Sequence, residues 1–207
     1  MNTRLLKGLY KKAEDFVKED FPEDYRNSVS VNLNTLKNMK SKTFISHYCW
    51  VVYAAGFKEA VLNEMFPRLK EAYKDFDIEK IVRMRSLEKV YSVNSHESKA
   101  HSFIEGVKLI HREGFSNLKK RMLLEGIDSL KDLPYIGDIT KKHLAKNIGL
   151  ADVAKNDIWL ERIKSYVNAN SVDELIHFIQ EEFDVSANTA DVVLWRYCAE
   201  NNDALKD

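Results

Sequence analysis

The chain has 207 residues, of which 44% are hydrophobic and 31% are charged. This balance is typical of a soluble globular protein and excludes a disordered chain, and no apolar run approaches the roughly 20 residues of a membrane-spanning helix. The chain has only two cysteines, Cys49 and Cys198, which excludes a four-cysteine zinc or iron–sulfur site built from this chain alone. We expect two buried thiols and no association with a membrane.

The net charge is zero, but the charges are unevenly distributed along the chain. Residues 80–125 hold ten Lys or Arg and five Asp or Glu, and residues 131–164 hold seven and five. Residues 165–207 hold only two basic residues and nine acidic ones. Because local charge determines what a surface binds, the middle of the chain suits a polyanion and the C-terminal part does not.

Breakers of regular structure are rare, with three prolines and seven glycines in the whole chain. Most segments show apolar spacing near 3.6 residues, which predicts an all-α fold. We expect one compact helical domain over residues 1–207, with two helical lobes and a cleft between them as a variant, and a polar connection over 28–43. The predicted helices are 5–17, 45–57, 57–73, 77–84, 87–91, 98–114, 115–126, 129–137, 139–149, 157–168, 171–183 and 188–201.

A tight turn joins two short predicted helices within residues 127–149. Pro134 fixes φ and Gly137 tolerates a positive φ, so both residues favour a reversal there. Such a turn exposes consecutive backbone amides at the start of the next helix, and these amides form an anion site. Basic residues on that helix add to the attraction: Lys141, Lys142, His143 and Lys146. The alternative is an ordinary helical hairpin with a solvated basic face.

The stretch LPYIGDITKKHLAKNIGLADVAKNDIWLERI extends this pattern. It resembles the helix-hairpin-helix motif and catalytic aspartate of the DNA glycosylase superfamily that includes endonuclease III and 3-methyladenine DNA glycosylase II. Asp157 falls at the position of the aspartate, and Arg162 lies on the helix that follows. Upstream, Lys99 and Ala100 match a Lys-Ala segment of the family, and the resemblance covers roughly residues 44–167. The matching hairpin residues are Leu133, Pro134, Ile136, Gly137 and Thr140.

Four residues depart from the family pattern. Tyr135 replaces the first hairpin glycine, Asp138 puts a negative charge at the start of a helix, and Asn156 stands where Pro or Val is frequent. Ile139 stands where the bifunctional members have the lysine that forms a Schiff base with the sugar. The resemblance therefore implies a monofunctional glycosylase without lyase activity. It also implies no iron–sulfur cluster, because no four-cysteine cluster follows the hairpin.

The resemblance assigns a role to each candidate site residue. Asp157 is the catalytic carboxylate, with water as the nucleophile; the alternative is an N-cap of the following helix. The DNA phosphates meet Tyr135, Gly137, Ile139, Thr140, Lys141 and Lys142. A flipped base meets a pocket or wedge formed by Trp50, Tyr53, Phe57 and Trp159, for which the alternative is a set of core aromatics. A basic cluster before the hairpin faces DNA or solvent: Lys119, Lys120 and Arg121.

The implied substrate is double-stranded DNA with a damaged base, and alkylated purines suit a single acid because their leaving base is already cationic. We expect a monomer that is cytoplasmic and associates with the nucleoid, or is nuclear in a eukaryote. A monovalent cation on the hairpin carbonyls, as in relatives, is the one ion that the resemblance allows. The six histidines show no metal-binding spacing.

Two other functions fit the sequence. The first is a DNA-binding protein that keeps the hairpin without the activity, and a buried, ion-paired Asp157 with no cleft beside it favours this reading. The second is a helical protein-interaction scaffold in which the hairpin is coincidental. Indifference to duplex DNA at low salt favours the scaffold, because phosphate contacts dominate affinity.

Overall fold

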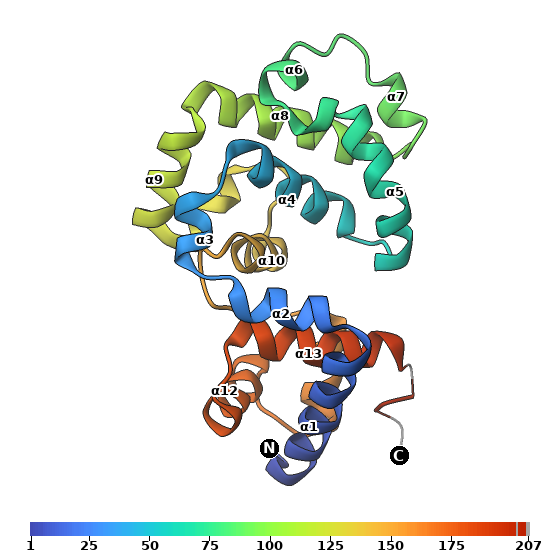
Figure 1. Cartoon of the computed structure of the whole chain (residues 1–207), viewed down its shortest axis with the longest axis vertical. Coiled ribbons are helices and arrows are strands. Elements are labelled where there is room, and N and C mark those ends of the chain that lie inside the picture. The colour runs from blue at the N-terminus through green and yellow to red at the C-terminus, as the bar shows by residue number, and fades with distance from the viewer. Residues whose placement is uncertain (202, 206–207) are drawn as a thin grey trace. The chain divides into compact units, whose positions relative to one another are not determined.

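The computed structural model describes residues 1–201 and 203–205, and all regular structure in this part of the chain is helical (Figure 1). The predicted all-α fold class is confirmed. The chain divides into two compact units: unit 1 contains Met1–Asn32 and Asp152–Asp207, and unit 2 contains Leu33–Ala151. The single-domain organisation stays a prediction. None of the helices among the described residues is both long and apolar enough to cross a membrane.

Unit 2 is built around one apolar helix, α4 (Ser41–Ala54), which packs against α5, α8 and α10. Seven of its residues are buried, so it is apolar on most of its circumference, as its sequence predicts. The other elements of the unit surround it in Figure 1. They are α3 (Leu33–Asn38), α5 (Glu59–Ala72), η1 (Lys74–Phe76), α6 (Ile78–Val82), α7 (Glu88–Tyr91), α8 (Glu97–Glu113), α9 (Phe115–Glu125), η2 (Gly126–Asp132) and α10 (Asp138–Ile148).

Tyr48 connects α4 to two distant segments of unit 2. Its hydroxyl lies 2.6 Å from the carbonyl oxygen of Pro134 and 3.3 Å from that of Ser102, so one phenol reaches both the hairpin turn and α8. A Cβ at Gly106 would lie 2.2 Å from the Tyr48 hydroxyl, so only glycine leaves room for this ring. The central helix thereby fixes the position of the hairpin turn.

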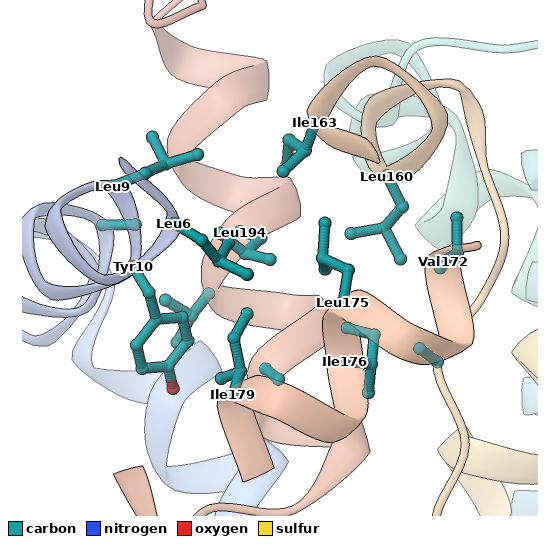
Figure 2. Close-up of a cluster of buried hydrophobic side chains, with 14 of the residues drawn as sticks. Leu6, Leu9, Tyr10, Leu160, Ile163, Val172, Leu175, Ile176, Ile179 and Leu194 are labelled. Atoms are coloured by element: carbon teal, nitrogen blue, oxygen red, sulfur yellow. The ribbon is translucent and has the colours of Figure 1, made fainter. Parts of the chain in front are cut away.

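Unit 1 brings the two ends of the chain together. Its helices are α1 (Thr3–Asp20), α2 (Pro22–Ser30), α11 (Ile158–Tyr166), α12 (Val172–Phe183) and α13 (Ala187–Glu200). Figure 2 shows their shared core, in which Leu6 of α1 meets Leu194 of α13 and Leu175 of α12. Burial of these aliphatic side chains supplies the main stabilising term of the unit.

Two helices, α2 and α3, lie outside the predicted helices. Helix α2 begins with Pro22 at its first position, which suits a helix N-terminus, and α3 lies inside the polar stretch 28–43. Contacts distant in sequence stabilise α2: Asp24 forms an ion pair with Arg196 at 2.6 Å, and Asn188 donates to the carbonyl of Ser28 at 2.9 Å. The predicted helix at 129–137 is also wrong, because a 3₁₀ segment ends at Asp132 and the turn follows.

Candidate functional site

The two units have opposite net charges. Unit 2 contains 21 Lys and Arg and 14 Asp and Glu, a net of +7. The residues of unit 1 include 11 basic and 18 acidic side chains, a net of −7. The zero total therefore conceals one basic body and one acidic body, and unit 2 is the body whose charge suits a polyanion.

The hairpin turn has its left-handed residue at Tyr135, where φ is 70°. Gly137 instead has φ −110° and ψ −166°, so the turn does not use the positive φ that Gly137 tolerates. Left-handed backbone costs a residue with a Cβ about 1–2 kcal/mol relative to glycine. Tyr135 stands where the motif that the chain resembles has its first glycine. A glycine there would adopt the left-handed conformation without strain. Its side chain is 37% exposed.

Replacement of Tyr135 by glycine tests this strain. We expect Tyr135→Gly to raise the free energy of unfolding by about 1 kcal/mol, because glycine adopts φ 70° without a steric penalty. Urea denaturation measures the change. Tyr135→Ala is the matched control, since it removes the ring and keeps the strain. A Tyr135→Gly protein no more stable than Tyr135→Ala would show that the backbone there is unstrained.

The N-terminus of α10 provides part of the predicted phosphate site. The Gly137 amide donates to Oγ1 of Thr140 at 2.7 Å, so both groups are used in a helix cap. In the described part of the chain, the amides of Asp138, Ile139 and Thr140 make no hydrogen bond, as is usual in the first turn of a helix. The Ile139 side chain is exposed beside them. The backbone of this turn can therefore meet an anion, whereas the Thr140 hydroxyl is already engaged.

Acidic neighbours compensate the lysines at the hairpin. The Lys141 amine lies 2.7 Å from Asp128 and 3.1 Å from Asp138, and its side chain is only 12% exposed. Lys131 lies 2.6 Å from Asp138. These contacts raise the pKa of Lys141 and lower that of Asp138. Lys142 is half-buried on the same helix. The hairpin is therefore close to neutral, and Lys141 binds a phosphate only if an ion pair gives way.

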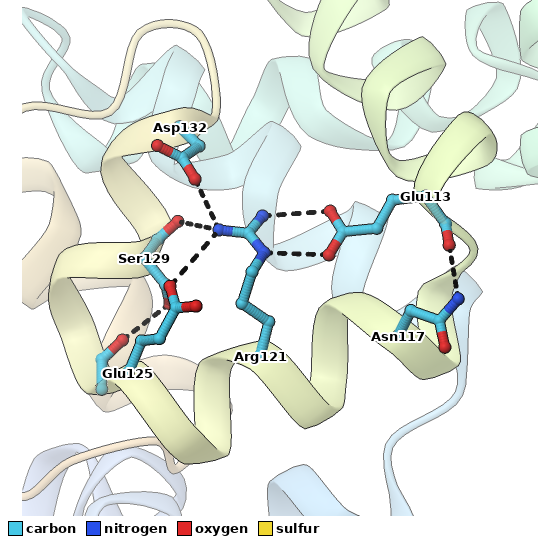
Figure 3. Close-up of polar contacts among 7 residues, drawn as sticks. Glu113, Asn117, Arg121, Glu125, Ser129 and Asp132 are labelled. Carbon is cyan, nitrogen blue, oxygen red and sulfur yellow. Dashed lines mark hydrogen bonds and ion pairs between the residues drawn. The ribbon is translucent and has the colours of Figure 1, made fainter.

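The basic cluster before the hairpin is largely structural. Arg121 forms a two-pronged ion pair with Glu113, at 2.9 and 3.0 Å, and also contacts Asp132 and the carbonyl of Ser129 (Figure 3). The hydrogen bonds that Arg121 donates to Glu113 raise the pKa of Arg121 and lower that of the glutamate. Lys119 donates to the backbone carbonyls of Lys37 and Met39. Neither residue fits the predicted orientation toward DNA, and Lys120 is the exposed member.

Lys99 is a buried residue of α8 whose ammonium lies at the C-terminal end of α4. Its ammonium donates to the carbonyls of Tyr53 and Ala55, and it lies 4.4 Å from the centre of the Phe57 ring and 5.8 Å from that of Tyr135. Burial lowers its pKa to about 8. The ammonium caps the last carbonyls of α4, where the helix dipole favours a positive charge. It thus orders Phe57, the candidate wedge, close to the hairpin.

The other candidate pocket aromatics have defined partners. Tyr53 is fully buried and its hydroxyl lies 2.8 Å from that of Tyr73, which fits the core role that was its alternative. Trp50 is half-buried and packs edge-on against Phe66. Trp159 is partly buried against the unit 1 core, with the Arg162 guanidinium 4.7 Å from its ring centre. Only Trp159 therefore belongs to the same unit as Asp157.

Asp157 is the N-cap of α11. Its Oδ1 accepts hydrogen bonds from the amides of Trp159 and Leu160, at 2.9 and 3.2 Å. Its Oδ2 lies 3.7 Å from the Lys155 amine, and the side chain is 12% exposed. Burial raises the pKa of Asp157 above its ordinary value, and the charge of Asp191 acts in the same direction. The capping role is confirmed. Both capping hydrogen bonds go to Oδ1, and Oδ2 accepts neither of them.

Comparison with protein-family models, curated proteins and solved structures finds no match. The likeness to the glycosylase superfamily therefore depends on the order and spacing of the residues given above. The glycosylase activity and the binding of DNA are therefore proposals.

Two residues of unit 1 were not identified from the sequence. Asp191 is 1% exposed and accepts a hydrogen bond from the Lys155 amide at 2.8 Å. Asp152 accepts hydrogen bonds from the amides of Ala187 and Asn188 and so caps α13. The sequence signal for Asp152 is weak, because its partners are about 35 residues away. Asp191 gives no signal beyond being an acid in a largely apolar helix.

The candidate ion sites are few. Among residues 1–201 and 203–205, no group of three His, Cys, Asp or Glu side chains could hold a metal ion. For the monovalent cation, two hairpin carbonyls are relevant: that of Pro134 accepts from Tyr48, and that of Tyr135 accepts from Thr140 at 3.3 Å. A cation would share these oxygens with hydroxyl donors, and its binding stays a prediction.

Proposed function

We propose that the protein is a monofunctional DNA N-glycosylase, which hydrolyses the bond between a damaged base and its deoxyribose in duplex DNA. The main supporting observation is the geometry of Asp157. Two backbone amides fix one of its oxygens, the side chain is mostly shielded from water, and the second oxygen lies outside the cap. A fixed, poorly hydrated carboxylate is suited to stabilising positive charge that develops on a sugar ring.

The proposed reaction needs only one carboxylate. The base leaves with the electrons of the glycosidic bond, and the ring acquires oxocarbenium character that the Asp157 carboxylate stabilises. Water then adds to the anomeric carbon and loses a proton, which yields an abasic site. A cationic alkylated purine leaves as a neutral base and so needs no general acid. Ile139 has no amine, so the reaction stops without strand cleavage.

Unit 2 is the proposed DNA-binding body. Its net charge of +7 gives attraction to phosphates, and the amides of Ile139 and Thr140 offer a local contact for one of them. Phe57 and Tyr135 are the aromatic side chains of this unit that are near the hairpin and at least partly exposed. In this proposal the aromatic rings contact bases and the backbone contacts phosphate.

A specific observation favours a second candidate, a DNA-binding protein without catalysis. Asp157 is both a helix cap and an ion-pair partner of Lys155, and a purely structural aspartate has the same contacts. The compensated Lys141 also favours a weak binder over a tight one. The two functions differ in one product, the abasic site.

A panel of duplexes distinguishes the functions. Each duplex contains a single alkylated, oxidised or deaminated base, and abasic sites are revealed by strand breaks after alkali. The proposal predicts base release from at least one class, with no strand break before alkali. Binding at low salt without release from any duplex would establish the non-catalytic function. Absence of both binding and release would leave the interaction scaffold.

A further inference from the structure

The segment that leads into Asp157 is attached to α13 at two points. Asp152 accepts hydrogen bonds from the amides of Ala187 and Asn188, at 3.0 and 2.9 Å, at the start of that helix. One turn further along, the buried carboxylate of Asp191 accepts the amide of Lys155 at 2.8 Å. An otherwise irregular segment thus has its path fixed by carboxylates that bond to backbone amides.

The second attachment is only two residues from Asp157. The Asp157 amide donates to the Lys155 carbonyl at 2.7 Å, which closes a tight turn between them. The Lys155 amine lies 3.7 Å from Oδ2 of Asp157, the oxygen outside the helix cap. The position of the Lys155 backbone therefore determines where Asp157 lies at the start of α11. The Lys155 side chain provides the cation next to Oδ2 of Asp157.

Asp191 also acts on Asp157 through its charge. The charged and titratable side chains near Asp157 are Lys155 in the preceding segment and Asp191 and Cys198 on α13. The negative charge of Asp191 adds to burial in raising the pKa of Asp157, whereas Lys155 lowers it. The pKa of the buried Cys198 thiol is raised to about 12, so it is neutral at physiological pH. Asp191 is thus the neighbouring anion that opposes ionisation of Asp157.

We propose that Asp191 is a positioning residue for Asp157: its carboxylate fixes the backbone at Lys155 and, through the turn that follows, the place of Asp157 at the start of α11. The catalytic part of this inference rests on the proposed glycosylase function. The contact between Asp191 and the Lys155 amide exists independently of it. Asp191 touches neither substrate nor reacting atoms and acts only through Lys155 and Asp157.

Two substitutions separate the contact from the charge. Asp191→Asn keeps an oxygen acceptor for the Lys155 amide and removes the negative charge. We expect its single-turnover rate at neutral pH to stay within a few-fold of the wild type, while the acid limb of the pH profile moves to lower pH. The sign follows because removal of an anion lowers the pKa of Asp157, which then stays ionised in more acidic solution. Asp184→Asn, an exposed acid of the same unit, is the control and should leave the profile unchanged.

Asp191→Ala removes both the acceptor and the charge. We expect the single-turnover rate to fall about tenfold or more, with half-saturation by DNA unchanged, because the carboxylate is displaced while the DNA contacts stay intact. If this variant does not fold, Asp191→Asn still provides the test. A wild-type rate and pH profile in an active Asp191→Asn protein would overturn the proposal.

A measurement without substrate separates this inference from the proposed function. Carboxyl carbon-13 NMR follows the titration of Asp157 in the full chain, and its midpoint should be lower in Asp191→Asn than in the wild type. An unchanged midpoint refutes the charge effect even if the protein is an active glycosylase. If the midpoint is lower in Asp191→Asn but the wild-type protein releases no base, the catalytic function is refuted and the coupling between Asp191 and Asp157 is confirmed.

Discussion

Asp157→Asn is expected to reduce base release by about 10²–10³-fold, which is the usual effect of removing one group that stabilises transition-state charge. The amide occupies the same space and keeps an oxygen for the amides of Trp159 and Leu160. Asn is also as good an N-cap as Asp, so the fold should be preserved. Single-turnover release from a damaged duplex measures the rate, and fluorescence anisotropy at low salt measures the retained DNA affinity.

The control for this prediction is Asp20→Asn, which makes the same chemical change at an exposed position in unit 1. It should leave the rate, the affinity and the thermal midpoint as they are. Unchanged base release in Asp157→Asn would remove Asp157 from the mechanism. Thermal stability should be equal or slightly higher in Asp157→Asn, because the raised pKa means that burial opposes the charged form.

Arg121→Met should destabilise the protein by about 2–4 kcal/mol, since it removes charged hydrogen bonds and leaves Glu113 partly buried without its cation. Figure 3 shows the guanidinium between Glu113 on one side and Ser129 and Asp132 on the other, so the loss also frees η2 from α9. The midpoint of urea unfolding measures the change. The methionine retains most of the aliphatic contact.

The pH dependence of this effect has a definite sign. Arg121 lowers the pKa of Glu113, so this contribution to stability is complete above the ordinary pKa of glutamate and is lost as pH falls through the lowered value. The difference in the free energy of unfolding between the wild type and Arg121→Met should therefore become smaller in acid. Lys120→Met on the same helix is the matched control and should change stability by no more than about 0.5 kcal/mol. Equal midpoints for the two variants would contradict a structural role for Arg121.

Helices with a strong apolar period could be predicted from the sequence. The segments that became α1, α4, α8 and α12 have such a period, and the structure confirms helices in all four. Helices α2 and α3 could not be predicted, because they are short and polar and α2 depends on partners such as Arg196, more than 160 residues away. Local spacing contains no information about such distant contacts.

The candidate site was predictable in part. Asp157 was found because an aspartate before an apolar helix is a recognisable N-cap and because it follows the hairpin at a characteristic distance. The left-handed backbone at Tyr135 was missed, since glycine is the usual residue for that conformation and Gly137 was available two positions later. The pairing of Arg121 with Glu113, and of Asp191 with Lys155, requires the tertiary structure.

The division of unit 1 between the two ends of the chain affects how the protein is made. During synthesis, α1 and α2 leave the ribosome before any of unit 2, while α11, α12 and α13 follow after all of it. The apolar face of α1, with Leu6, Leu9 and Tyr10, must therefore wait for partners that are translated last. Unit 2 is continuous and can fold during that interval. A ribosome stalled when all of unit 2 has left the exit tunnel, but α11 has not, would hold a foldable unit 2 and an α1 that is free for chaperones to bind.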